Sequence, residues 1–285
     1  MRSSYGTQLR DALAKESILP FIGVYDVFSA TLAGRYFNSL FISGFSFAAS
    51  HYGLPDIGFI AWSDIVSFVQ RVRTVLPEHH LLVDIDDGYC DPEVACHVVS
   101  LLEGIGASGV VLEDQQRPRK CGHLDGKQIM ELGQYVTKLE RVVKTRRDLY
   151  VVARTDASDP ADIACRAEAY AKAGADAILV DGLRDTEMIR KLKTQVRKPL
   201  VVSQIGGGQS PPASLAELKE LGASLVIYST PCLFAAQGAI ENAMRSLQSN
   251  DGVLSAVPSG TVDLKQCNVI LNQNLANREL LRVAH

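Results

Sequence analysis

The feature that most restricts the fold of this chain is a regular alternation of short apolar runs with longer amphipathic stretches. Each run is rich in Val, Ile and Leu, which is typical of a parallel strand buried on both faces. Phrases such as AKAGADAILV and KELGASLVIY share one order, a helix closed by glycine and then a buried strand. The apolar runs span residues 18–24, 39–45, 81–86, 107–114, 149–156, 176–182, 199–208 and 224–230.

Eight such units predict a single-domain (β/α)8 barrel, or TIM barrel, over residues 1–250. A doubly wound open sheet has the same alternation, but this chain lacks a GxGxxG segment after its first run, and even spacing favours closure. A length of 285 residues suits this fold, because such barrels commonly take about 250 residues. Residues 251–285 are predicted to form a C-terminal helical extension that packs on the barrel or on a neighbouring subunit.

Composition excludes several classes of protein. The net charge is −3 with both signs mixed along the chain, so no basic stripe indicates a nucleic-acid partner. No apolar run approaches the roughly 20 residues that span a bilayer, and the N-terminus lacks the apolar segment of a secretory signal. The six cysteines are scattered without CxxC spacing, as reduced thiols would be. We therefore expect a cytoplasmic protein whose partner is a small molecule rather than nucleic acid or membrane.

Carboxylates follow the apolar runs at the carboxyl ends of the predicted strands, where the active sites of such barrels lie. Asp84 and Asp86 are two residues apart on one predicted strand, which would direct both side chains to the same side, and Glu113 ends the next strand. Carboxylates gathered beside an apolar core repel each other and lose hydration, and a bound cation relieves both costs. Oxygen ligands without His or Cys at metal spacing favour Mg2+ or Mn2+ over zinc. Each acid taken singly also suits a solvated strand end or a helix N-cap.

A second group of residues lies in the polar loop after the fourth apolar run. Cys121 follows Arg119 and Lys120 and precedes Gly122 and His123. Because neighbouring positive charge lowers the pKa of a thiol, we expect Cys121 to act as an acid or base near neutrality. Gly122 frees the backbone to approach a ligand. On composition alone an exposed basic turn is the better interpretation, but the position directly after an acidic strand favours a functional role.

Taken together, these segments resemble the isocitrate lyase/phosphoenolpyruvate mutase superfamily. The loop, LEDQ…P.KCGH, is similar to the mobile active-site loop of the carbon–carbon bond lyases in that superfamily. VDIDDGY resembles its metal-binding DADTGYG, VVARTDA its strand-5 motif, GVYDVFSA its first-strand signature, and GLPD a loop whose Asp reaches the metal through water. The match spans roughly residues 10–245 in unbroken order.

The resemblance implies a Mg2+-dependent homotetramer, a dimer of dimers, in which the last helix is swapped between subunits. It also assigns residues motif by motif. The implied metal site comprises Asp84 and Asp86 as ligands, with Asp56 and Glu113 behind them. The implied substrate contacts are Tyr25, Ser43, Gly44, Phe45, Gly122, Asp181 and Ser203, and the implied catalytic residues are Cys121 as proton donor, His123 and Arg154.

Departures from the family pattern narrow the substrate. Asp181 ends the sixth strand where the family has Glu, and Ser203 and Gly206 stand where Asn and Glu are usual. Phe234 falls where methylisocitrate lyases carry an Arg, although Phe also suits plain core packing. Because each desolvated carboxylate of a substrate needs a cationic partner, the loss of that Arg favours a smaller or less charged acid.

The predicted activity is a Mg2+-dependent, retro-aldol-type cleavage of a small 2-hydroxy di- or tricarboxylic acid of the isocitrate or alkylmalate type. The products are a 2-oxo acid and a carboxylate, and Cys121 protonates the carbon that loses its bond. One alternative is a phosphonopyruvate or carboxyphosphonoenolpyruvate mutase, or an oxaloacetate hydrolase or decarboxylase, on the same scaffold. The other is a ligand-binding barrel without catalysis, which the departures at Asp181, Ser203 and Gly206 favour.

Overall fold

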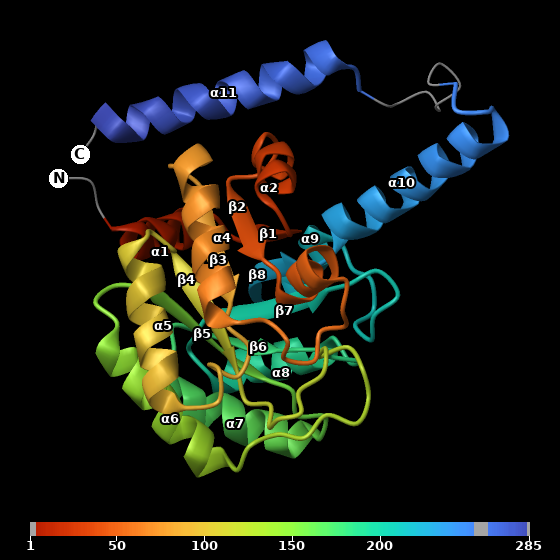
Figure 1. The fold of residues 1–285 in the computed structure, drawn as a ribbon. Helices are drawn as coiled ribbons and strands as arrows, with labels where there is room; N and C mark the ends of the chain where they lie inside the picture. The colour runs from red at the N-terminus through yellow and green to blue at the C-terminus, as the bar shows by residue number, and fades with distance from the viewer. Residues whose placement is uncertain (1–3, 254–261, 284–285) are drawn as a thin grey trace.

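The computed structural model of the chain describes residues 4–253 and 262–283 and contains the predicted barrel (Figure 1). Its parallel strands pair in chain order and close between the first and the last, where Leu19 lies opposite Leu225. The strands are β1 (Leu19–Val24), β2 (Ser39–Ile42), β3 (His80–Asp84), β4 (Gly109–Glu113), β5 (Tyr150–Thr155), β6 (Ala177–Val180), β7 (Leu200–Gln204) and β8 (Ala223–Tyr228).

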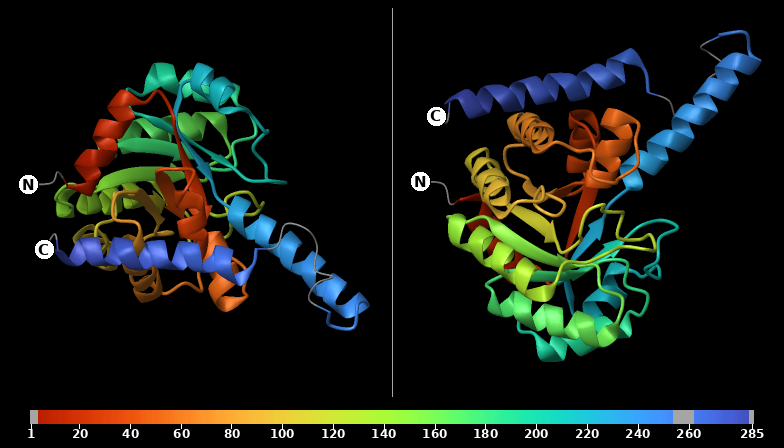
Figure 2. Two further views of the ribbon diagram at one scale, coloured as in Figure 1. Left: turned by 90° about the horizontal axis from the view of Figure 1, so that it is seen from above. Right: turned by 60° about the horizontal axis from the view of Figure 1, so that its bottom comes forward.

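Helices alternate with the strands and surround the barrel (Figure 2). Several begin at a capping side chain. Asp91, Asp159 and Ser214 accept hydrogen bonds from backbone N–H groups of the first turn, which have no partner inside the helix. The helices after the strands are α2 (Val27–Gly34), α3 (Gly44–Phe47), the π-helical η1 (Ala48–Tyr52), α4 (Trp62–Val75), α5 (Pro92–Gly104), α6 (Leu132–Thr145), α7 (Pro160–Lys172), α8 (Glu187–Gln195), α9 (Leu215–Leu221) and α10 (Pro231–Ser249).

Most strands end earlier than the apolar runs predict, and two of these ends shape the candidate site. The run over 39–45 leaves the sheet at Ile42, because the Ser43 side chain caps α3 by accepting from the Ser46 N–H at 3.2 Å. The run over 81–86 ends at Asp84, and Asp86 adopts a φ of 51°, outside the strand conformation. The prediction that Asp84 and Asp86 share a strand was therefore wrong.

The core has two layers. Residues such as Phe21, Phe41 and Leu82 fill the barrel, and a larger apolar layer lies between the strands and the surrounding helices. Leu9 of α1 (Tyr5–Lys15) packs into the inner layer, and α1 contacts β3, β4 and β5. The sequence patterns did not indicate this helix.

The last two helices depart from the ring around the barrel. α10 projects away from the body of the molecule and has no buried residue (Figures 1 and 2). α11 (Leu264–Val283) runs back across α2 and α4, where Asn274 donates to Thr31 Oγ1 and Asn277 to the Val75 carbonyl, each at 2.9 Å. Among the described helices, none combines the length and the hydropathy that a membrane crossing requires.

Candidate active site at the carboxyl ends of the strands

A small cavity lies at the carboxyl ends of the strands. Its volume is about 20 Å3, which is enough for about one water molecule. The loop after β4 contributes Cys121 and Gly122 to its wall, so the cavity is that of a covered site. Its lining comprises Phe41, Ser43, Phe45, Asp56, Asp84, Val111, Cys121, Gly122, Arg154, Leu179, Asp181, Ser203, Ile205, Ile227 and Ser229.

Asp84 and Asp86 meet beside Gly44, although they do not share a strand. A Cβ on Gly44 would lie 3.0 Å from Asp84 Oδ2 and 3.3 Å from Asp86 Oδ1, so only glycine lets the backbone approach both carboxylates. Neither oxygen of Asp86 accepts a hydrogen bond from the described residues. Burial raises the pKa of both carboxyls, that of Asp86 well above its usual range, and neighbouring acids add to the effect. Two adjacent buried carboxyls, one of which accepts no hydrogen bond from the described residues, are suitable ligands for a cation.

Arg119 lies among the other predicted metal residues. Its guanidinium binds Asp56 through Nη1 and Glu113 through Nε at 2.8 Å, and its Nη2 lies 3.2 Å from Asp86 Oδ1 without hydrogen-bond alignment. Burial raises the pKa of Glu113 to about 7, although Arg119 and Arg154 oppose the shift. In the described part of the chain, no three His, Cys, Asp or Glu side chains are arranged to hold a metal ion.

The four predicted metal residues therefore separate into two pairs. Asp84 and Asp86 are oxygen donors that fit Mg2+ as direct ligands, because this ion takes one or two carboxylates and completes its shell with water and substrate oxygens. Asp56 and Glu113, which the family resemblance places behind these ligands, bind Arg119, and their role around a metal stays a prediction.

Arg154 of β5 is held by acids on three sides. Its Nε donates to Asp156 Oδ2 at 2.9 Å, and its Nη2 lies 2.9 Å from Asp181 Oδ2 and 3.2 Å from Glu113 Oε2. Burial alone would lower the pKa of Arg154, but these three carboxylates raise it well above its usual range. The contacts use Nε and Nη2, which leaves Nη1 for the carboxylate of a ligand.

The environment of Cys121 contradicts the expected low pKa. Burial raises the pKa of the Cys121 thiol to about 11, and the Asp181 carboxylate adds to the increase. The two basic neighbours in sequence do not offset this, because Arg119 binds other acids and the Lys120 ammonium approaches Gly126. At neutral pH the thiol therefore keeps its proton, which is the state a proton donor needs.

His123 points toward the seventh strand. Its Nε2 lies 3.3 Å from Ser203 Oγ and 3.3 Å from Asp181 Oδ1, and its Nδ1 accepts from the Gln209 N–H at 3.0 Å. Because Nδ1 is an acceptor, neutral His123 carries its hydrogen on Nε2 and donates it toward these partners. Burial opposes ionisation of Asp181, but Arg154 and His123 hold the pKa of that carboxyl below its usual range.

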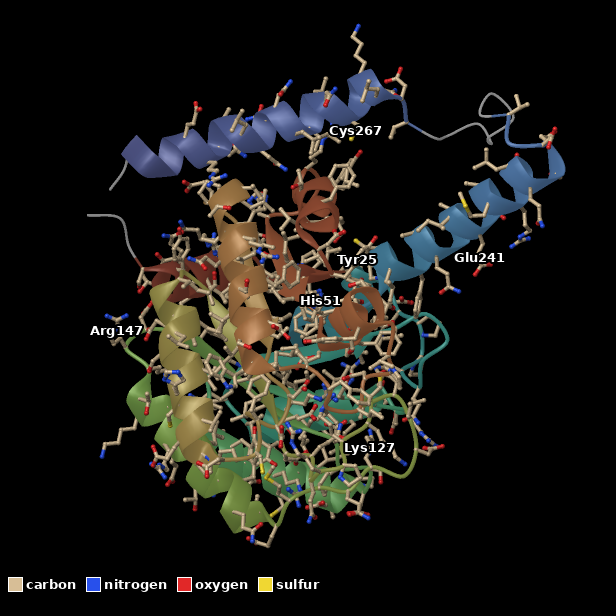
Figure 3. All side chains as sticks on the ribbon, viewed as in Figure 1. Tyr25, His51, Lys127, Arg147, Glu241 and Cys267 are labelled. Atoms are coloured by element: carbon tan, nitrogen blue, oxygen red, sulfur yellow. The ribbon has the colours of Figure 1, made fainter. Side chains whose placement is uncertain are left out.

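Two predicted substrate contacts, Tyr25 and Gly44, do not line the cavity, and of these Gly44 lies against Asp84 and Asp86 while Tyr25 lies farther away. It is half-buried beside Asp26 and Cys232, near the start of α10 and apart from Lys127 of the loop (Figure 3). Phe45 lines the cavity and meets the Phe234 ring edge to face, with centroids 6.3 Å apart.

Two residues that sequence reasoning missed complete the charge network. Asp156 binds Arg154 through both carboxylate oxygens, and Lys127 donates to Asp156 at 3.2 Å and to the Gly122 carbonyl. The position of Asp156, two residues after Arg154 at a strand end, was the available signal. No signal in the sequence pointed to Lys127, because its contacts depend on how the loop folds.

Comparison with known proteins gives consistent matches. Residues 9–248 match the family model described as phosphoenolpyruvate phosphomutase. The chain is 33% identical over 260 residues to a 2-methylisocitrate lyase of Shewanella oneidensis, covering 88% of each chain. A structure of oxaloacetate acetylhydrolase with 3,3-difluorooxalacetate matches at 28% identity and a TM-score of 0.89, covering 96% of this chain and 95% of the other. A structure of 2,3-dimethylmalate lyase matches at 28% identity and a TM-score of 0.87, covering 99% and 95%.

Proposed function

This chain belongs to the phosphoenolpyruvate phosphomutase family, and from that membership we propose that it is a Mg2+-dependent carbon–carbon lyase. The proposed reaction cleaves a small 2-hydroxy dicarboxylic acid of the alkylmalate type into a 2-oxo acid and a carboxylate. Relatives named as 2-methylisocitrate lyase and 2,3-dimethylmalate lyase support the reaction class. The observation that carries the proposal is that Cys121 lines the same cavity as Asp84 and Arg154. Burial raises the pKa of its thiol to about 11, which suits a proton donor.

The proposed metal ligands are Asp84 and Asp86. When bound, Mg2+ would supply Lewis-acid polarisation of the oxygen atoms of the substrate. Arg119 keeps Asp56 and Glu113 beside these ligands.

The side chains of the cavity have separate roles in this proposal. Nη1 of Arg154 binds one substrate carboxylate, and Ser43 lies at the same wall. The ionised Asp181 carboxylate in the same cavity wall takes the proton of the C2 hydroxyl. As the bond between C2 and C3 breaks, the oxygen on C2 becomes a carbonyl and the bonding electron pair passes to C3. The Cys121 Sγ then gives its proton to C3, and the covering loop keeps water from competing as the proton source.

The charge of the cavity supports a dicarboxylate over a tricarboxylate. Among the described residues, Arg154 is the only basic side chain in the cavity lining, which also includes the apolar Phe45, Ile205 and Ile227. Phe234 stands at the position where methylisocitrate lyases carry an Arg. Its ring packs against Phe45 and supplies no positive charge. A third desolvated carboxylate would have no partner there.

Hydrolysis of oxaloacetate or of a related 2-oxo diacid is the second candidate. The likeness to oxaloacetate acetylhydrolase favours it. The two candidates differ in what they need from the loop, because hydrolysis requires a water molecule at the C2 carbonyl of the 2-oxo acid, whereas the lyase excludes water from C3.

We further propose a homotetramer in which α10 is covered by a neighbouring subunit. α10 exposes Phe234, Ile240 and Met244, and a helix with an apolar stripe and no buried residue is unfavourable in water. Division of the chain into a barrel over 1–250 and an extension over 251–285 is part of this proposal.

Product analysis tests the reaction. The purified protein is incubated with Mg2+ and, separately, with 2,3-dimethylmalate, 2-methylisocitrate, oxaloacetate and phosphonopyruvate, and mass spectrometry identifies the acid consumed. Cleavage of an alkylmalate to two acids is expected. Conversion of oxaloacetate to oxalate and acetate, with no cleavage of any alkylmalate, would replace the lyase with the hydrolase.

A further inference from the structure

Arg119 is the most deeply buried basic side chain of the described loop that covers the cavity. Only 1% of its side chain is exposed, although it belongs to a polar loop. Its acidic partners come from three separate segments: Asp56 before α4, Asp86 after β3 and Glu113 at the end of β4. A guanidinium suits this position, because its planar fork can meet several carboxylates at once.

Acidic side chains outnumber guanidinium groups at the carboxyl ends of the strands, so each guanidinium there offsets repulsion between carboxylates. The acidic side chains of the network are Asp56, Asp84, Asp86, Glu113, Asp156 and Asp181, and its guanidinium groups are Arg119 and Arg154. Arg154 belongs to a barrel strand and stays in place when the loop moves. Arg119 is carried by the loop, so opening the loop would remove one of the two guanidinium charges and leave buried carboxylates without it.

The rest of the loop is held less firmly. The Gln115 side-chain amide donates to the Lys120 carbonyl at 2.7 Å and accepts from the Lys120 N–H at 2.8 Å. These two hydrogen bonds fold the loop on itself. Arg117 binds Asp87 through two bonds of 2.9 and 2.8 Å, but its side chain is 37% exposed, so solvent weakens that pair. Lys127 meets one barrel acid, Asp156, at 3.2 Å, and 12% of its side chain is exposed. Arg119 is therefore the more buried of these basic contacts, and it meets acids from three segments.

We propose that Arg119 is a positioning residue that anchors the covering loop to Asp56, Asp86 and Glu113 and thereby holds Cys121 in the cavity. The Arg119 backbone lies two residues before Cys121, so fixing its side chain fixes the thiol. This role concerns the closed state of the loop and does not depend on whether the reaction is lyase or hydrolase chemistry.

The rate at which Cys121 is alkylated tests the anchor, because a buried thiol reacts only after the loop opens. Wild type, Arg119→Gln and Lys120→Gln are treated with iodoacetamide in EDTA, and peptide mass spectrometry follows each cysteine separately. We expect Cys121 of Arg119→Gln to react at least about tenfold faster than wild type, since a broken buried ion pair shifts the opening equilibrium by that order or more. Lys120→Gln removes the same charge from the next residue, which is partly exposed, and should react like wild type.

Cys96 serves as the internal control, because it is buried in α5, away from the loop. An unchanged Cys96 rate in Arg119→Gln shows that faster Cys121 alkylation comes from the loop and not from a loosened barrel. Cys121 reacting at the wild-type rate in Arg119→Gln would overturn the proposal, as would an equal acceleration in Lys120→Gln.

Glu113→Gln tests the same anchor from the barrel side if Arg119→Gln does not fold. The substitution keeps the shape of Glu113 and removes the charge that meets Arg119 Nε at 2.8 Å. Faster Cys121 alkylation with an unchanged Cys96 rate supports the anchor. Alkylation of Cys121 at the wild-type rate would overturn it.

Discussion

Arg154 and Asp181 form a buried ion pair of 2.9 Å across the ends of β5 and β6, and the backbone of Gly122 lies directly against it. A Cβ on Gly122 would stand 2.0 Å from Asp181 Oδ2 and 2.5 Å from Arg154 Nη2. The loop can therefore reach its closed position only with glycine at residue 122, and closure brings Cys121 beside the pair.

Gly122→Ala is expected to prevent this closure. The methyl group would have to displace a buried ion pair, so the loop should stay open, Cys121 should become alkylated faster, and kcat should fall by about 10² or more because the proton donor is misplaced. Steady-state kinetics and thiol alkylation measure the two effects. Gly104→Ala is the matched control, because no atom lies within 4 Å of the added Cβ; kinetics like those of Gly104→Ala would refute the role of Gly122.

Chelation is expected to remove activity. EDTA should abolish turnover and Mg2+ or Mn2+ should restore it, because burial makes ionisation of Asp84 and Asp86 costly and a bound cation offsets that cost. Asp84→Ala should keep its circular dichroism spectrum yet show no heat of Mg2+ binding in calorimetry. Full turnover in chelator would contradict the metal assignment.

The barrel could be predicted from sequence because its signal is repeated. Each buried strand is an apolar run and each following helix is amphipathic, so errors at single boundaries do not change the topology. The conformation of Asp86 could not be predicted, since its positive φ depends on how the chain leaves β3. α1 was missed because its apolar residue Leu9 covers the end of a barrel that exists only after the strands close.

The site could be predicted as a set of residues but not as a network. Sequence placed Asp56, Asp86 and Glu113 together, and a metal was the obvious cation for them. The chain brings its own guanidinium from Arg119, and only the path of the loop shows this. The prediction of a lowered pKa for the Cys121 thiol was wrong for the same reason. The sequence shows which charged residues are adjacent to Cys121, but the fold determines where their side chains point.

The alkylation of Cys121 should rise steeply with pH. A thiol with a pKa of about 11 is about 10⁻³ thiolate at pH 8, and its rate should increase about tenfold per pH unit up to that pKa. The exposed Cys90 and Cys165 should react first at neutral pH. A pH series with peptide mass spectrometry measures this, and Cys121 as the fastest cysteine at pH 7 would disprove it.

Assembly through α10 can be tested by placing a charged side chain on its apolar stripe. Ile240→Asp places a carboxylate on the apolar stripe of α10 and should shift the protein from tetramer toward monomer or dimer, measured by light scattering at micromolar concentration. Asn242→Asp adds the same charge to another face of the helix and should leave the mass unchanged. A monomeric mass for the unmodified protein would contradict the assembly.

Cys121→Ser separates lyase chemistry from its alternatives. Serine keeps the shape of the side chain but is too weak an acid to protonate a carbanion, so kcat should fall by about 10²–10⁴, the range of general acid–base groups. KM should change little, because the proposed carboxylate contact at Arg154 is untouched. The loop should still close, since Arg119 and Gly122 are unaltered, and a metal-binding titration should match wild type. A phosphoryl-transfer chemistry, which protonates no carbon through this thiol, would lose far less activity. Near-normal turnover of Cys121→Ser on its true substrate would therefore exclude the lyase mechanism while leaving the barrel, its acids and its covering loop in place.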